Sequence, residues 1–200
     1  MSRNDKSRKK SYLIVKRILD FICSLVAIII LFVPMLVIML IIRIESPGPA
    51  IFKQQRMGKD GKAFTIYKLR SMRMDAPSDK ATREFSDSSN YITKFGSFIR
   101  RTSIDELPQL INILNGSMSF VGYRPVCMTE LTLNGLRKEK GVFSMKPGLT
   151  GLAQISGRDN LTYEKKASVD AEYIDKCSFS FDVWCIYKTV IVVLTGEGAR

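Results

Sequence analysis

A long apolar run near the N-terminus constrains the fold of this 200-residue chain more than any other feature. Between Phe21 and Ile42 the sequence is FICSLVAIIILFVPMLVIMLII, without a charged residue. About 20 apolar residues are enough for a helix to cross a bilayer. A cleaved signal peptide fits poorly, because the run is longer than a typical signal core and no small-residue cleavage site follows it. The run therefore predicts a membrane-embedded helix rather than a buried helix of a soluble protein.

The flanking charges and one proline indicate how this helix lies in the membrane. Basic residues stand on both sides of the run: Arg3, Lys6, Arg8, Lys9, Lys10, Lys16 and Arg17 before it, and Arg43, Lys53, Arg56, Lys59 and Lys62 after it. A spanning helix usually carries its basic excess on the cytoplasmic side only. Pro34 would also divide the run into pieces of about 13 and 8 residues, too short for a hydrocarbon core of about 30 Å. We therefore expect a re-entrant helix within residues 1–45, broken at Pro34, with a proline-kinked spanning helix as the alternative.

Residues 46–200 predict one small, mostly helical domain that begins with a β-hairpin. Two strand-like segments, Ala50–Arg56 and Ala63–Lys68, flank turn residues at 58–61. Residues 73–92 are polar and indicate a surface loop. The helices predicted from periodicity and capping residues are Thr93–Arg101, Asp105–Leu114, Met128–Lys138 and Thr162–Lys176. Strands and helices together predict an α+β domain.

Two loops and a last apolar segment complete the predicted domain. The segments Ser117–Val126 and Lys146–Gly151 contain turn residues and are predicted as loops. Neither matches a nucleotide-binding glycine motif, so they assign no nucleotide-binding fold. The segment Asp182–Leu194 is too short to span a bilayer, and its Trp184 and Tyr187 suit a membrane interface. A core helix explains this segment equally well.

An acidic pair is the main candidate for chemistry, because the chain contains no histidine. General-base or nucleophilic chemistry must then come from carboxylates, hydroxyls, thiols or lysines. Asp105 and Glu106 lie between Arg100 and Arg124 in the sequence, a combination that suits a metal ion and a phosphate. The alternative is a helix start, since Ser103-x-x-Glu106 fits a capping box. The short pattern by itself favours the cap.

Charge and cysteine usage narrow the partners. The formal net charge of +12 implies an anionic partner, which could be nucleic acid, anionic lipid or a phosphorylated substrate. No nucleic-acid-binding motif and no regular basic stripe is present in the sequence, so nucleic acid is not the expected partner. The cysteines form no CxxC pair, which argues against zinc and favours reduced thiols in a cytosol-facing protein. They are Cys23, Cys127, Cys177 and Cys185.

Four motifs in order carry a resemblance to a known family. They are DFICSLVAIIILFVPM, AIFKQQRMGKDGKAFTIYKLRSM, SIDELPQLINILNGSMSFVGYRP and KPGLTGLAQISGRD. Together they resemble the bacterial sugar transferases, also called small monotopic phosphoglycosyl transferases, over about residues 12–195. The resemblance implies a re-entrant helix and a small cytoplasmic catalytic domain with interfacial helices, lying on the surface of the bacterial inner membrane. Each motif alone would be weak evidence, and their order makes the match specific.

The resemblance also implies a reaction and a set of site residues. Members transfer a sugar-1-phosphate from a UDP-sugar to undecaprenyl phosphate and release UMP, the first membrane step in assembling a capsule, O-antigen, exopolysaccharide or glycoprotein glycan. By this resemblance Asp105 is the nucleophile, forms a covalent phosphosugar intermediate and contacts Mg²⁺, while Glu106 assists it. The residues expected to bind phosphate, nucleotide, sugar or metal are Lys68, Arg100, Arg124, Arg158 and Asp170.

Some positions depart from the family pattern. Val33, Ser117 and Tyr123 stand where the family usually has serine, aspartate and proline, and Leu152 and Ser156 replace a usual tryptophan and asparagine. These changes keep the reaction class but leave the helix geometry and the substrate contacts open. The sequence also leaves open the sugar, the glycan pathway and the oligomeric state, with a homodimer as a candidate. The alternative functions are a membrane-anchored basic protein that binds lipid or nucleic acid, and a non-catalytic scaffold.

Overall fold

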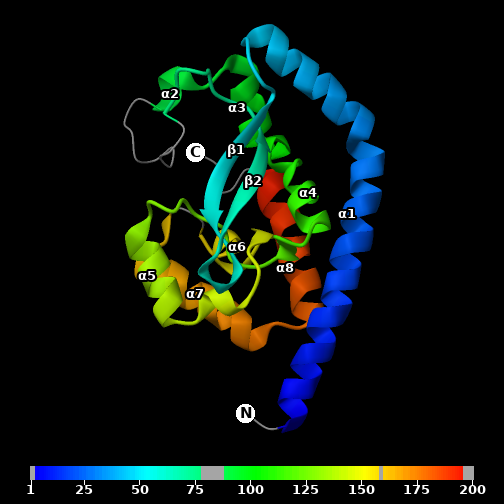
Figure 1. Cartoon of the computed structure of the whole chain (residues 1–200), viewed down its shortest axis with the longest axis vertical. Helices are drawn as coiled ribbons and strands as arrows, with labels where there is room; N and C mark the ends of the chain where they lie inside the picture. The colour runs from blue at the N-terminus through cyan, green and yellow to red at the C-terminus, as the bar shows by residue number, and fades with distance from the viewer. Residues whose placement is uncertain (1–2, 78–87, 158–159, 196–200) are drawn as a thin grey trace.

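The computed structural model describes residues 3–77, 88–157 and 160–195 and contains both helices and strands (Figure 1). The elements of the first half are α1 (Arg3–Glu45), β1 (Ile51–Met57), η1 (Lys59–Gly61), β2 (Ala63–Leu69), α2 (Ser88–Tyr91), α3 (Lys94–Arg101), η3 (Ile104–Glu106) and α4 (Gln109–Leu114). Those of the second half are β3 (Ser119–Val121), α5 (Leu131–Glu139), η4 (Val142–Ser144), β4 (Gly148–Thr150), α6 (Leu152–Ile155), α7 (Tyr163–Lys176) and α8 (Phe179–Thr195). The predicted mixture of helix and sheet is confirmed.

Helix α1 runs without interruption through Pro34, so the predicted break at this residue is wrong. A proline removes one backbone donor and crowds the preceding turn, and a long helix can absorb this as a bend when the turns on both sides stay intact. Figure 1 shows α1 changing direction in its C-terminal third. Among the described residues, α1 is the one helix long and apolar enough to cross a membrane, and 6% of its most apolar window is buried. This exposed apolar surface is compatible with membrane association, and re-entry stays a prediction.

One face of α1 packs along the rest of the chain, and both ends of its apolar part are attached there. Near the N-terminal end, the Arg17 guanidinium donates to the carbonyl oxygens of Ile113 and Leu114 at 2.7 and 2.8 Å. Near the C-terminal end, a Glu45 carboxylate oxygen accepts from the Phe95 N–H at 2.9 Å. Between these points, side chains of α1 pack against the hydrophobic cluster of Ile66, Leu110, Ile113 and Met118. The opposite face exposes Ile29, Ile30, Phe32, Val33, Val37 and Leu40.

The β-hairpin is present as predicted and places β2 beside α4. Strands β1 and β2 are antiparallel, and the register pairs Ile51 with Leu69 and Met57 with Ala63. The connection contains Asp60 and Gly61 with φ of 57° and 71°, which is the left-handed region that tight turns use. The hairpin is tied to α4 by the Asn112 side chain, which accepts from the Tyr67 N–H and donates to the Thr65 carbonyl. Lys68 is thereby held next to the start of α4.

A second sheet lies inside segments that the sequence predicted as loops. Strands β3 and β4 are short and parallel, and Ser119 and Val121 pair with Gly148 and Thr150. Glycine makes this pairing sterically accessible: a Cβ on Gly148 would lie 2.1 Å from the Gly122 nitrogen, and one on Gly151 would lie 1.8 Å from the Gly122 carbonyl oxygen. The glycines of the Lys146–Gly151 segment therefore serve close backbone contact between distant parts of the chain.

The helix predictions hold best where a capping residue is present. Thr93 and Thr162 cap α3 and α7 by accepting from the N–H groups of Gly96 and Lys165. Helix α5 begins at Leu131 rather than Met128. Its start is delayed because the chain first turns, with the Glu130 N–H donating to the Cys127 carbonyl. Residues 78–87 of the predicted loop 73–92 lie outside the described part of the chain.

The predicted helix Asp105–Leu114 is in fact two short helices, η3 and α4, that meet at Pro108. Helical spacing predicts one apolar face of Leu107, Leu110, Ile111 and Leu114. Leu110 is buried as expected, but Ile111 is exposed and the fully buried residue is Ile113. A change from three to 3.6 residues per turn rotates the buried side of α4 relative to a single continuous helix. This rotation turns Gln109, Leu110 and Ile113 inward.

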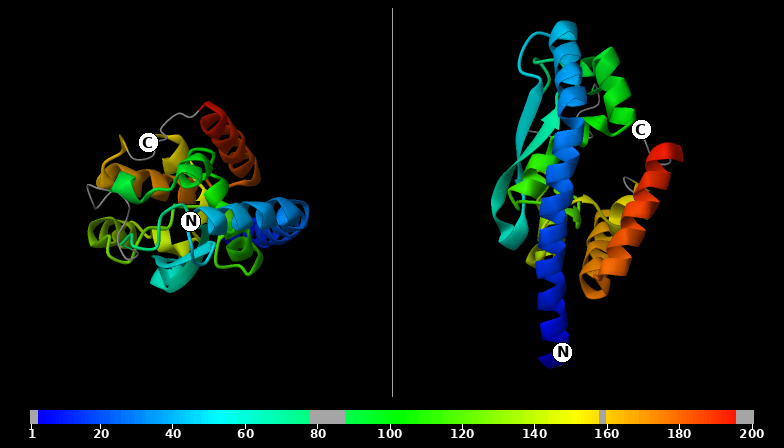
Figure 2. Two further views of the ribbon diagram at one scale, coloured as in Figure 1. Left: turned by 90° about the horizontal axis from the view of Figure 1, so that it is seen from above. Right: turned by 90° about the vertical axis from the view of Figure 1, so that its right-hand side faces the viewer.

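Helix α8 lies on the outside of the molecule (Figure 2). Within it only Asp182 and Cys185 are buried. It exposes the large apolar side chains Phe179, Val183, Trp184, Ile186, Tyr187, Val190 and Leu194. Its start is joined to α1 by an ion pair between Lys16 and Asp182 at 2.6 Å. An ordinary core helix is thereby excluded for this segment, and its position in a membrane interface stays a prediction.

All four cysteines are free thiols.

Candidate active site

The carboxylate of Glu106 accepts hydrogen bonds from two basic side chains that come from distant parts of the chain. The Lys68 ammonium on β2 lies 2.7 Å from Glu106 Oε1, and Arg124 Nη2 lies 2.8 Å from the same oxygen. Arg124 Nη1 lies 3.4 Å from Oε2. Glu106 itself is in η3, so a strand, a helical turn and the loop after β3 meet at this carboxylate. Burial alone would raise the pKa of Glu106, but Arg124 and Lys68 outweigh it and hold this pKa well below its usual range.

The capping-box interpretation of Ser103 and Glu106 is wrong. Ser103 has φ of 58° and makes no side-chain capping hydrogen bond. Its backbone instead forms a tight turn, in which the Ser103 N–H donates to the Arg100 carbonyl and the Ser103 carbonyl accepts from the Glu106 N–H. A left-handed residue at this point reverses the chain after α3. The two acids therefore face the hairpin and Arg124 rather than their own helix start.

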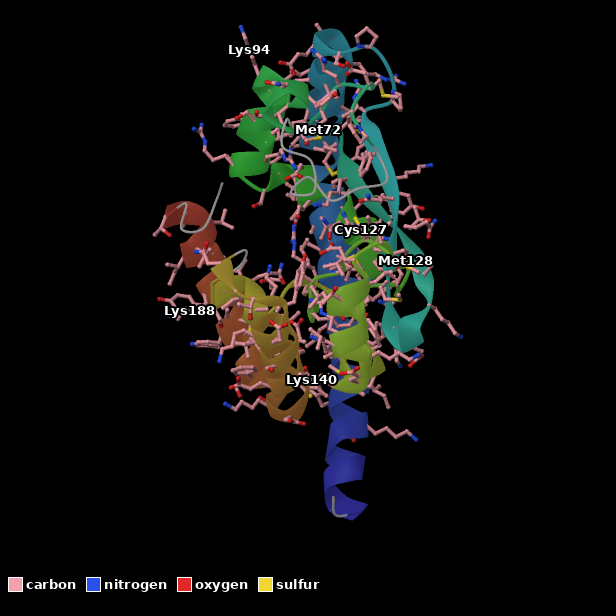
Figure 3. All side chains as sticks on the ribbon, turned by 90° about the vertical axis from the view of Figure 1, so that its left-hand side faces the viewer. Met72, Lys94, Cys127, Met128, Lys140 and Lys188 are labelled. Atoms are coloured by element: carbon pink, nitrogen blue, oxygen red, sulfur yellow. The ribbon has the colours of Figure 1, made fainter. Side chains whose placement is uncertain are left out.

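Arg124 is held in place because its loop is attached to the hairpin. The Met57 N–H donates to the Val126 carbonyl at 3.2 Å, and Arg56 forms an isolated bridge with Cys127. Figure 3 shows Cys127 and Met128 beside the hairpin strands. These contacts fix the backbone just after Arg124 and so help to keep its guanidinium within hydrogen-bond distance of Glu106.

Asp105 lies next to Glu106 but in a different environment. Its residue is 8% exposed, and within the described part of the chain its carboxylate has no hydrogen-bond or ion-pair partner. Burial raises the pKa of Asp105 to about 6; the charge of Lys68 opposes this shift and that of Glu106 adds to it. At neutral pH the carboxylate is mostly ionised, and its oxygens are available to an incoming electrophile or cation. This is the state that a carboxylate nucleophile needs.

A small cavity lies beside Glu106, and its charged lining is mostly basic; Asp105, the neighbour of Glu106 in the chain, is not part of this lining. Its lining residues are Arg56, Ile66, Lys68, Glu106, Gln109, Arg124 and Pro125. Three cationic side chains face one carboxylate here, so the cavity favours an anion. Guanidinium and ammonium groups in such an arrangement bind phosphoryl oxygens. The arrangement can therefore hold a phosphoryl group beside Glu106, one residue from the carboxylate of Asp105.

Comparison with known proteins assigns the chain to a family. The family model described as bacterial sugar transferase matches residues 11–196. This chain belongs to the bacterial sugar transferase family. The matched region includes the apolar run of α1, the hairpin, Asp105–Glu106 and Arg124, so it covers every part of the site described above. The sequence resemblance to this family is confirmed.

Three relatives show how this sugar transferase compares with longer and similar-sized members. The galactosyl transferase CpsE of Streptococcus agalactiae is 41% identical, over 98% of this chain and 45% of its own length. The uncharacterized sugar transferase EpsL of Bacillus subtilis is 39% identical, over 94% of this chain and 91% of its own length. The UDP-glucose:undecaprenyl-phosphate glucose-1-phosphate transferase of Escherichia coli is 38% identical, over 93% of this chain and 41% of its own length. The chain thus spans less than half the length of two of these relatives.

The three remaining predicted site residues of this sugar transferase, Arg100, Arg158 and Asp170, differ in where they lie relative to the two acids. Arg100 is brought to the site: burial lowers its pKa, and the charges of Asp105 and Glu106 oppose this shift. Arg158 lies outside the described residues. Asp170 is not brought to the two acids. It is buried in α7, where Arg137 donates to its Oδ2 from Nε at 2.9 Å and from Nη2 at 2.6 Å.

Arg137 is a site-supporting residue that the sequence reasoning missed. While it pairs with Asp170, its Nη1 donates to the Arg124 carbonyl at 2.8 Å. Its guanidinium also lies 5.2 Å from the ring centroid of Tyr123. Asp170 therefore acts on the site through Arg137 and the Arg124 backbone. The only sequence signal was a basic residue in the last turn of a predicted helix, which ordinarily indicates compensation of the helix dipole.

The donor set at the acids fits Mg²⁺ held jointly with a phosphate. Over the described ranges, no group of three or more His, Cys, Asp or Glu residues is placed to hold a metal ion. Mg²⁺, however, commonly binds through one or two carboxylates together with substrate phosphates and water. Asp105 could supply such a carboxylate, and no ion-pair partner for it lies in the described part of the chain.

Proposed function

We propose that this protein transfers a sugar-1-phosphate from a UDP-sugar to undecaprenyl phosphate, with Asp105 as the nucleophile. The observation that carries the proposal is the contrast between two adjacent acids. Glu106 is engaged by Lys68 and Arg124, whereas Asp105 is buried, ionisable near neutrality and without a partner within the described chain. The name of the Escherichia coli relative describes the same class of reaction.

The proposed reaction has two displacement steps on one phosphorus atom. In the first, an Asp105 carboxylate oxygen bonds to the sugar-bearing phosphorus, and the bond to the bridging oxygen breaks, so that UMP leaves with that oxygen. In the second, a phosphate oxygen of the lipid attacks the same phosphorus and releases the Asp105 carboxylate. The product is a polyprenyl diphosphate sugar. Neither step needs a proton acceptor, which suits a chain without histidine.

The basic residues reduce the charge repulsion that opposes both steps. Each substrate is an anion that approaches a carboxylate, and Coulomb repulsion disfavours this approach. Lys68 and Arg124 lie against Glu106 and line the same cavity, where ammonium and guanidinium groups can bind phosphoryl oxygens. Glu106 keeps these two cations in position. Bound Mg²⁺, held by Asp105 and phosphate oxygens, would neutralise charge that develops on the leaving phosphate.

The position of α1 supports a re-entrant, monotopic arrangement on the cytoplasmic face of the inner membrane. Arg17 and Glu45 stand near opposite ends of the apolar run, yet both bind the same compact part of the chain. A helix that spans the bilayer would place these two residues on opposite sides, because 28 residues of helix extend about 42 Å. The exposed apolar face of α1 can enter one leaflet while the acids stay at the level of the lipid headgroups.

A donor panel in a membrane tests the proposal. The protein is reconstituted in phospholipid nanodiscs with undecaprenyl phosphate and Mg²⁺, and UMP release is measured for a set of UDP-sugars. We expect turnover with at least one donor and no turnover without the lipid phosphate beyond one equivalent. Wild-type turnover by Asp105→Asn would show that Asp105 is not the nucleophile. Absence of turnover with every donor would favour the non-catalytic alternatives, a lipid-binding or scaffold protein.

A further inference from the structure

Gln109 carries a buried amide whose donor group is unused. The residue is 2% exposed and is the first residue of α4. Within the described ranges, its Nε2 is buried and has no hydrogen-bond partner. Buried side-chain amides are nearly always hydrogen-bonded, because an unsatisfied donor loses its bonds to water without replacement. This buried donor could therefore bind an acceptor that the described part of the protein does not provide.

The amide lines the same cavity as the ion-paired groups of the site. Gln109 lies there with Lys68, Glu106 and Arg124. The only carboxylate of that lining already accepts from both cations, at 2.7 and 2.8 Å on one oxygen. Apart from Glu106 and Gln109 itself, the polar side chains of the lining are basic, and these donate and do not accept. A molecule that enters the cavity can supply the missing acceptor, and the positive charge of the lining favours an anion.

We propose that the Gln109 amide donates a hydrogen bond to a phosphoryl oxygen of the bound substrate. The inference rests on the proposed function and adds a substrate-binding residue to it. An amide supplies a directional hydrogen bond without a further positive charge, so it orients the phosphoryl group without drawing Asp105 into an ion pair. Because α4 follows η3 directly, the backbone that positions the acids also positions this donor. The phosphoryl oxygen can belong to the sugar nucleotide or to the lipid phosphate.

Two substitutions and one control test the role of the amide. Gln109→Leu removes the donor and keeps a similar volume, and Gln109→Glu replaces it with a carboxylate that repels phosphate. The control is Gln55→Leu, at an exposed position of β1 outside this cavity. We expect Gln109→Leu to lower kcat/KM about 10- to 100-fold, as for a lost hydrogen bond to a charged group. Gln109→Glu should lose more, and the control should keep the wild-type value.

Stability separates a substrate contact from a structural one. If the amide has no partner in the free protein, Gln109→Leu removes an unsatisfied buried donor, so its melting temperature should equal or exceed that of the wild type. A clear fall in melting temperature together with the loss of activity would show that the amide supports the fold, and would overturn the proposal. Wild-type kcat/KM in Gln109→Leu would overturn it as well.

Binding measurements distinguish the two phosphoryl sources and do not depend on turnover. Isothermal titration of UMP and of inorganic phosphate is compared between the wild type and Gln109→Leu, and KM is measured for each substrate in turn. Weaker UMP binding with a raised donor KM assigns the contact to the nucleotide. Unchanged UMP binding, weaker binding of inorganic phosphate and a raised KM for undecaprenyl phosphate together assign the contact to the lipid phosphate. If the wild type turns over no donor, the proposed function fails, while unchanged UMP and phosphate binding in Gln109→Leu would refute the amide contact separately.

Discussion

Asp105 and Glu106 are neighbours in the chain, yet their carboxylates lie in opposite electrostatic environments. Glu106 is bound by Lys68 and Arg124, which hold its pKa low against the effect of burial. Asp105 is buried without a partner inside the described chain, and its pKa is raised to about 6. Environments that separate the pKa values of two adjacent acids commonly accompany a division of roles. Here they indicate one acid for chemistry and one for organising the cations.

Asp105 alone should form a covalent adduct. When the wild type is mixed with a reactive UDP-sugar in the absence of lipid phosphate, we expect one equivalent of UMP and a phosphosugar adduct in the intact-protein mass spectrum. Asp105→Asn should show neither and should lose at least about 10³-fold in turnover. Glu106→Gln should still form the adduct, although more slowly. An adduct on Asp105→Asn would contradict the assignment.

The activity should depend on pH through Asp105. Because attack requires the ionised carboxylate, kcat/KM should rise as the pH increases through about 6 and then level off. Glu106→Gln removes a like charge beside Asp105 and releases Lys68. We therefore expect the pH at which kcat/KM rises to fall by about one unit. The matched control is Glu164→Gln, at an exposed position of α7, which should not change the pH at which kcat/KM rises. If Glu106→Gln does not shift this pH, a group other than Asp105 controls the rise in kcat/KM.

The same two acids should affect stability in opposite directions. The folded-state pKa of Asp105 lies above the ordinary value of 3.8, so its contribution to the free energy of unfolding is lost as the pH rises toward about 6. The pKa of Glu106 is lowered from 4.5, so its contribution is present above that value and is lost as the pH falls below it. Chemical denaturation of Asp105→Asn and Glu106→Gln across this range should resolve the two opposite slopes.

The buried pair of Arg137 and Asp170 should matter for both stability and activity. Their side chains are 2% and 1% exposed, so removing one charge leaves the other buried and unpaired. Asp170→Asn should cost about 3–5 kcal/mol in the free energy of unfolding. It should also lower activity, because Arg137 supports the Arg124 carbonyl.

A double-mutant cycle checks this interpretation of the pair. Arg137→Met with Asp170→Leu should regain part of the stability but not the activity, since the contact with Arg124 stays absent. The exposed pair of Glu172 and Lys176 on the same helix provides the control, and Glu172→Gln should not measurably change the unfolding midpoint. Additive losses in the Arg137–Asp170 cycle would contradict a coupled pair.

Glycine substitutions should separate the parallel sheet from ordinary helix positions. Gly151→Ala places a Cβ 1.8 Å from the Gly122 carbonyl oxygen, so β3 and β4 must move apart. We expect a loss of soluble, folded protein or a strongly lowered melting temperature. Gly135→Ala is the control, because a Cβ there meets nothing within 4 Å and the residue lies inside α5. This change should stabilise by about 0.5–1 kcal/mol.

The topology of α1 can be tested by cysteine accessibility. Single cysteines are placed at Ser2 and at the exposed Lys53, in a variant in which Cys23 and Cys177 are replaced. A re-entrant helix predicts that a membrane-impermeant thiol reagent labels both positions from the cytoplasmic side only. Labelling of Ser2→Cys and Lys53→Cys from opposite sides would instead require a spanning helix bent at Pro34.

Local signals predicted those parts of the fold that depend on neighbouring residues. The hairpin and the starts of α3 and α7 follow from turn residues, alternation and threonine caps, which act over a few positions. The predictions failed where distant contacts decide. The break at Pro34 was wrong because a packed apolar helix continues past one missing hydrogen bond. The β3–β4 pairing was missed because three-residue strands carry almost no periodicity.

The sequence by itself determined the class of this protein: an apolar segment, an acidic pair without histidine and ordered motifs that place the chain among bacterial sugar transferases. Only the tertiary structure decided which acid has no partner among the described residues, which cations bind its neighbour, and that Arg137 and Gln109 lie close to the site. The reason is physical. Composition and short patterns set what residues can do, whereas burial and long-range packing set their charge state and their partners.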